Sequence, residues 1–88
     1  MKGEQIIARA YGGRPLVRRI WAEGKRVIYI TDEFEYQRLM RGEKALEPVG
    51  FPREDIFVFD QTLAESMEKL CRKGKWDWDK LIPWSGTE

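Results

Sequence analysis

Few residues in this chain could perform chemistry, and histidine is missing altogether. Without histidine the chain lacks the commonest general acid or base, the commonest metal ligand and every Ser-His or Cys-His nucleophile pair. The one cysteine, Cys71, excludes an internal disulfide and a cysteine-based zinc site. Because Cys71 falls on the apolar stripe near the end of a predicted helix, where the helix dipole disfavours a thiolate, we predict a core residue.

Carboxylate pairs are the remaining catalytic option. Asp32, Glu33 and Glu35 cluster at the start of a predicted helix, where negative charge is favourable without any function. Asp77 and Asp79 alternate with tryptophans in "WDWD", a pattern that could place an acid pair beside a sugar-stacking platform, but the segment is too short to fix both carboxyls. "YGGRP" lacks the Lys-Ser ending and the following helix of a phosphate-binding loop. We therefore predict no catalytic, cofactor-binding or metal-binding residue and no enzymatic activity.

One class of binding that remains is a protein-interaction, accessory or regulatory module that uses exposed aromatic side chains. The candidate partner-binding residues are Trp76, Trp78, Trp84 and Tyr29. In the alternative interpretation, the three tryptophans close a small core together with Leu81 and Ile82. The need of an 88-residue chain for apolar burial favours that interpretation of the tail.

The other class is nucleic-acid binding by a basic amino-terminal hairpin. Its candidate residues are Arg14, Arg18, Arg19, Lys25 and Arg26. Residues 1–30 carry seven Lys or Arg against two Glu, a local charge of +5, and residues 31–88 carry nine against thirteen acids, a local charge of −4. Alternate strand residues face opposite ways, so Arg18 and Arg19 cannot line one surface. We therefore prefer a protein partner and keep nucleic acid as the alternative.

Length and composition predict one small globular domain over residues 1–88. The chain has 12% aromatic and 35% charged residues, which is typical of a soluble domain with a dense core. Nowhere do eighteen apolar residues follow one another, and the opening residues lack an apolar run of signal-peptide length. We expect neither a membrane span nor secretion, and the single cysteine favours the cytoplasm.

The elements that must position these residues begin with a strand over Glu4–Tyr11, which "GGRP" ends. The run "LVRRIWAEGKRVIYIT", residues 16–31, predicts a β-hairpin with a type II′ turn at Gly24 and Lys25. That turn pairs Ile20 with Tyr29 across the hairpin. Both hairpin faces are largely apolar, so we expect a barrel or sheet interior on one face and a helix on the other.

A short helix is predicted after the hairpin. Asp32 is the expected N-cap, Glu35 completes a capping-box pattern, and Gly42 closes the helix in the left-handed conformation. The following residues 43–54 are expected to be irregular, since Pro48 and Pro52 rule out a regular helix or a central strand.

A short strand and a second helix are predicted to complete the chain. The strand covers Asp55–Asp60. The helix begins with Thr62 as N-cap, and Glu65 occupies the capping-box position. The resulting element order is ββ-β-α-β-α.

The stretch "GFPREDIFV", Gly50–Val58, is similar to the last segment of Src-homology-3-like (SH3-like) barrels. In that segment a glycine, an aromatic or aliphatic residue and a proline lead through one tight helical turn into the closing strand. The resemblance covers nine residues and carries no binding residues over. Together with the element order it implies an α+β or mostly β class: a small antiparallel sheet or partly open SH3-like barrel, with a C-terminal helix packed on it.

Overall fold

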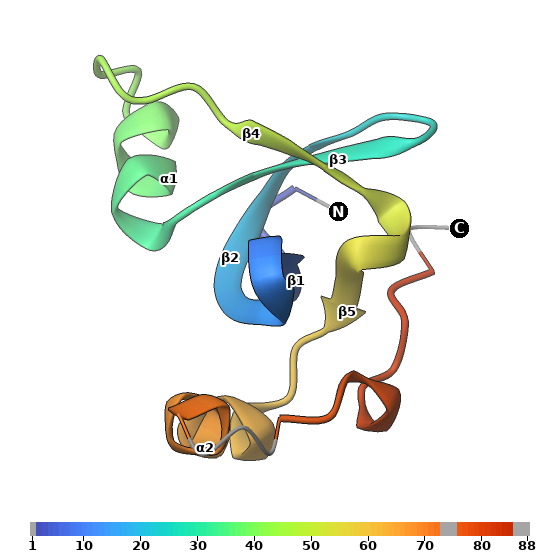
Figure 1. The fold of residues 1–88 in the computed structure, drawn as a ribbon. Helices are drawn as coiled ribbons and strands as arrows, with labels where there is room; N and C mark the ends of the chain where they lie inside the picture. The colour runs from blue at the N-terminus through green and yellow to red at the C-terminus, as the bar shows by residue number, and fades with distance from the viewer. Residues whose placement is uncertain (1, 73–75, 86–88) are drawn as a thin grey trace.

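The computed structural model describes residues 2–72 and 76–85, without the side chains of Ala64, Glu68, Cys71 and Arg72. Five strands form one antiparallel sheet in the order β4-β3-β2-β1-β5, which curls into a half-barrel (Figure 1). The strands are β1 (Gln5–Ala10), β2 (Arg14–Glu23), β3 (Val27–Thr31), β4 (Val49–Pro52) and β5 (Ile56–Val58). The helices are α1 (Glu33–Met40) and α2 (Gln61–Arg72), and the single-turn 3-10 segments are η1 (Tyr11–Gly13), η2 (Arg53–Asp55) and η3 (Trp78–Lys80). The predicted α+β class with an antiparallel sheet is confirmed.

The β2–β3 hairpin has a different register from the predicted one. Ile20 pairs with Ile30, not with Tyr29, and a β-bulge at Trp21 makes Ala22 the partner of Tyr29. A bulge adds one residue to one strand, so it resets the alternation of side chains beyond it. The bulge therefore leaves Ile20 and Ile30 on the same buried face, where the predicted register separated them.

The predicted type II′ turn is also wrong. The Gly24 N–H donates to the carbonyl of Val27 at 2.8 Å, so the turn is formed by Lys25 and Arg26. A type II′ turn requires a positive φ at its first central residue, and Gly24 does not have one.

The sheet is apolar on both sides. Its concave side holds the main core, whose buried members are Ile6, Ala8, Ile20, Ile28, Ile30, Ile56 and Trp84. A second cluster lies on the convex side, where Ile7, Phe57 and Leu81 contact partly buried residues that include Leu63 and Met67 of α2. Both faces of β1 and β5 are therefore buried, as expected. One face lines the interior of the half-barrel, and α2 and the C-terminal tail pack against the other.

Helix α1 begins and ends as predicted. The Asp32 carboxylate accepts a hydrogen bond from the Glu35 N–H at 2.7 Å, and Gly42 has a φ of +73° after the last turn. Only the Asp32 half of the predicted capping box is present, since the Glu35 carboxylate accepts from the Leu46 N–H at 2.9 Å rather than from the Asp32 N–H. Glu35 therefore fastens the following loop to the helix.

Helix α2 begins earlier than predicted. The Asp60 carboxylate accepts from the Leu63 N–H at 3.2 Å, so Asp60 is the N-cap and Thr62 lies inside the first turn. Asp and Thr are both good N-cap residues, so the sequence alone could not show which of Asp60 and Thr62 caps the helix. The side chain of Cys71, predicted to be a core residue, lies outside the described part of the chain.

Strand β4 lies in a segment predicted to be irregular. It pairs only with β3 and forms one edge of the sheet. Prolines are tolerated in edge strands because one side of the strand has no partner to receive a hydrogen bond. The expectation that proline excludes a central strand holds, but an edge strand was missed.

The direction in which each backbone N–H of β4 points explains how the strand accommodates proline. The Arg53 N–H donates to the Arg26 carbonyl at 3.2 Å, which fixes which residues of the β4 segment face β3. In an antiparallel pair the inward-bonding positions alternate with outward ones. Gly50 and Pro52 are therefore outward positions of β4, and Pro48 immediately precedes the strand.

The other edge of the sheet, β5, is covered by the C-terminal tail. The Val58 N–H donates to the Ile82 carbonyl at 2.8 Å, and the Trp84 N–H donates to the Ile56 carbonyl at 3.0 Å. The tail therefore runs as an extended segment beside β5. On its other end, β5 is joined to β4 by the single turn of η2.

Candidate functional site

The concave face of the half-barrel is open at a groove between β2, β3, β4 and the start of α1. The groove has a volume of about 230 Å³. Its apolar lining is Leu16, Ile30, Leu46, Val49 and Phe51, and its polar lining is Arg18, Thr31, Asp32, Glu35 and Glu47. Leu46 is 72% exposed and Val49 is 58% exposed, so two large apolar side chains stand in solvent beside an apolar floor.

Two contacts position the wall of the groove that includes Leu46. The cap at Asp32 fixes where α1 starts, and Glu35 one turn later faces the loop. The hydrogen bond from the Leu46 N–H to Glu35 then holds the loop against the helix. Since the bond uses the backbone of Leu46, its side chain is left free to contact another molecule.

The polar lining of the groove is acidic in balance. Three carboxylates, Asp32, Glu35 and Glu47, face one cation, Arg18. The Arg18 guanidinium donates to the carbonyl of Val17 at 2.8 Å. The lining of the groove thus combines an apolar floor with carboxylates and one guanidinium, and it contains no histidine or cysteine.

The tryptophans predicted as partner-binding residues make internal contacts. Trp84 is 7% exposed, and its indole N–H donates to Glu4 at 3.0 Å. Trp78 is half-buried, donates to the carbonyl of Gly13 at 2.9 Å, and meets Trp76 edge-on with ring centroids 5.7 Å apart. These contacts and the buried Leu81 match the interpretation in which the tail closes the core, but Ile82, which that interpretation also placed in the core, is 67% exposed.

Tyr29, the fourth predicted partner-binding residue, is 44% exposed. It lies beside Gly50, where an added Cβ would stand 3.4 Å from the tyrosine ring. None of these four residues lines the groove. Sequence reasoning missed Leu46 and Val49, and the only signal available for them was a pair of apolar residues within a stretch rich in charge and proline.

The five basic residues predicted for nucleic-acid binding do not share a surface. Arg14 begins β2, whereas Lys25 and Arg26 form the turn beyond its other end. Arg18 lines the groove. Arg19, the next residue along the strand, faces the convex side and is engaged in a network of its own.

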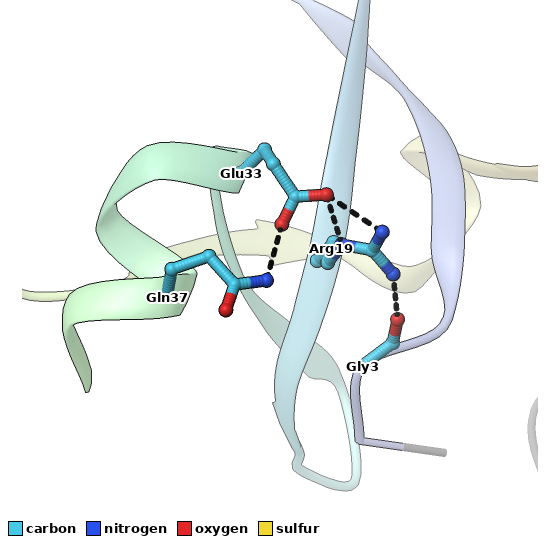
Figure 2. A network of polar contacts seen from close by, with 4 residues as sticks. All are labelled: Gly3, Arg19, Glu33 and Gln37. Atoms are coloured by element: carbon cyan, nitrogen blue, oxygen red, sulfur yellow. Dashed lines mark hydrogen bonds and ion pairs between the residues drawn. The ribbon is translucent and has the colours of Figure 1, made fainter. Parts of the chain in front are cut away.

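Arg19 connects the amino-terminal segment to α1, as Figure 2 shows. Its guanidinium donates twice to one oxygen of Glu33, at 2.9 and 2.6 Å, and once to the carbonyl of Gly3 at 2.7 Å. Gln37 donates to the other oxygen of Glu33 at 3.0 Å. The hydrogen bonds from Arg19 and Gln37 hold the pKa of the Glu33 carboxyl below its ordinary value.

Replacing Glu33 with Gln should make stability less sensitive to acid. Because the folded-state pKa of Glu33 is lowered, its contribution is complete above the ordinary value near 4.5 and is lost as the pH falls through the lowered value. At neutral pH the variant should lose less than about 1 kcal/mol, since Glu33 is half exposed and screened by solvent. Urea unfolding at about pH 7 and about pH 3, with Glu54→Gln as the control, measures both effects. Equal acid sensitivity of Glu33→Gln and the wild type would contradict this.

The remaining observations bear on other kinds of site. Within residues 2–72 and 76–85, no group of three or more His, Cys, Asp or Glu is arranged to hold a metal ion. The same residues contain no helix with the length and apolar character needed to cross a membrane. In comparisons with known proteins, the chain matches no family model, no curated protein and no solved structure.

Proposed function

We propose that this domain is a non-enzymatic protein-interaction or accessory module whose partner docks in the groove. The observation that carries the proposal is the exposure of Leu46 and Val49 beside the apolar floor formed by Ile30 and Phe51. An apolar centre with a polar rim is the usual anatomy of a protein interface. The hydrogen bond from Leu46 to Glu35 supports it further, because a fixed loop loses less entropy on binding.

Nucleic-acid binding is the weaker alternative. Its affinity would come from several phosphates neutralised on one surface. The candidate cations lie at both ends of β2 and on both of its faces, and Arg19 already bonds to Glu33. We further propose a cytoplasmic location, which a single cysteine fits.

We also propose that the half-barrel is a variant of the SH3-like barrel. Its strand order, in which β5 follows a single 3-10 turn and pairs with β1, supports this. In this interpretation, α1 and the loop after it are an insertion between β3 and β4. The insertion supplies Leu46 and Glu47, so it builds one wall of the docking groove.

Selection of short random peptides displayed on phage, with the immobilised domain as bait, tests the docking proposal. Synthetic copies of the selected peptides should shift the NMR amide signals of residues that line the groove. Leu46→Glu should weaken their binding by about tenfold or more, since a charge at an apolar contact costs about 1.4 kcal/mol or more.

The matched control is Ile82→Glu. Ile82 is another exposed aliphatic residue, at 67%, and lies outside the groove. Both variants should keep the wild-type melting temperature, because neither side chain is buried. The proposal is wrong if no peptide is selected, or if Ile82→Glu weakens binding as much as Leu46→Glu.

A further inference from the structure

The carboxylates of the groove retain capacity to bind a cation. Asp32 and Glu35 each accept one backbone N–H, at 2.7 and 2.9 Å, through a single oxygen. A carboxylate has two oxygens with about four acceptor positions, so both residues keep free positions and their charge. Glu47 adds a third carboxylate on an exposed part of the loop.

Arg18 leaves most of this negative charge unbalanced. It is the single cation against three carboxylates in the groove, which gives the lining a formal charge of −2. In the described part of the chain, no ion pair joins Arg18 to any of the three. Arg38 and Lys44 line an adjoining hollow together with Glu35 and Leu46 and offset the charge of Glu35. The negative charge that a partner meets in the groove is therefore that of Asp32 and Glu47, beside an apolar floor.

The size of the groove limits what can fill it. Pockets that enclose small-molecule ligands measure roughly 300–1,000 Å³. At about 230 Å³ this groove is smaller, and it can take one large side chain or two small ones from an extended segment. The apolar floor selects an aliphatic or aromatic side chain for that position.

We propose that the partner is a protein segment in which an apolar side chain enters the groove and a neighbouring Lys or Arg pairs with Glu47. This inference rests on the proposed docking function and specifies the chemistry of the partner. Opposite charge across an interface favours association, and a like charge opposes the wrong partner. Acidic segments and phosphate groups should accordingly be rejected.

The residues of the selected peptides and a charge exchange at Glu47 test the inference together. Peptides selected on the domain should contain Lys or Arg beside their apolar anchor. Glu47→Lys should weaken their binding about tenfold, and it should restore binding to a synthetic peptide in which that Lys or Arg is replaced by Glu. Glu54→Lys, at an exposed residue outside the groove, should have no more than a twofold effect.

The outcomes separate this inference from the docking proposal. The charge inference would be overturned if the selected peptides lacked basic residues and bound Glu47→Lys as tightly as the wild type. If their binding were still weakened by Leu46→Glu, the groove would remain the docking site. Binding insensitive to both Leu46→Glu and Glu47→Lys would overturn both.

Discussion

Replacing Trp84 with Ala should lower the free energy of unfolding by about 3–5 kcal/mol, the usual cost of truncating a buried aromatic side chain. The Trp84 ring belongs to the main core inside the half-barrel. The indole N–H also donates to Glu4, directly before β1, and this bond is lost in the variant, whereas the backbone N–H of residue 84 can still donate to Ile56. Because small domains have only about 5–15 kcal/mol of stability in total, the variant should melt far below the wild type.

Thermal and urea unfolding followed by circular dichroism measure this effect. Trp84→Phe is the informative control, since it keeps an aromatic ring in the core while it removes the N–H that donates to Glu4 and part of the ring volume. It should cost about 1–2 kcal/mol. If Trp84→Ala stayed within about 0.5 kcal/mol of the wild type, the ring would not be a core residue and its candidacy as a partner-binding residue would return.

Arg53→Ala should cost about 2–3 kcal/mol, because charge-assisted hydrogen bonds contribute more than neutral ones. The Arg53 guanidinium donates to the carbonyls of Lys25 at 2.9 Å and Gly24 at 3.0 Å, and it forms an ion pair with Glu23. It also lies 5.6 Å from the centroid of the Trp84 ring. One side chain from η2 thus holds the β2–β3 turn, which has no glycine at a positive φ to stabilise it.

Arg41→Ala is the matched control for Arg53. Arg41 is also paired with a glutamate, but its partner Glu43 is two residues away and both side chains are exposed. Such a local surface pair is screened by solvent and should contribute little to stability, so Arg41→Ala should melt close to the wild type. Arg53→Lys keeps the charge and removes the forked donor geometry, so it should behave more like Arg53→Ala than like the wild type. Equal melting temperatures for Arg53→Ala and Arg41→Ala would contradict the role of Arg53.

The ends of α1 and the first strands could be predicted from residues that are close together in the sequence. The cap at Asp32 and the left-handed closure at Gly42 each depend on residues within one turn of the helix end, and both are present. The alternation of apolar residues also predicted the first strand and the hairpin that follows it.

The features that sequence reasoning missed depend on contacts between distant residues. The bulge at Trp21 turns its ring toward Tyr36, with centroids 6.0 Å apart, and toward Lys2, whose ammonium lies 3.7 Å from the ring centroid. Neither contact is visible in the pattern of the hairpin itself. The groove depends in the same way on the bond between Glu35 and Leu46, which joins a helix to a loop that carries no recognisable motif.

The prolines beside Gly50 determine what can happen at the free edge of β4. A new strand laid against an edge is held by donors that point outward, and amyloid-like polymerisation repeats that pairing from one molecule to the next. Of the two outward positions of β4, 50 and 52, only Gly50 has an N–H to offer. An incoming strand would leave its acceptor opposite Pro52 without a bond, and Pro48 lies directly before the strand, so the edge is a poor template. The same prolines that obscured β4 in the sequence thus oppose the addition of a further strand at this edge of the sheet.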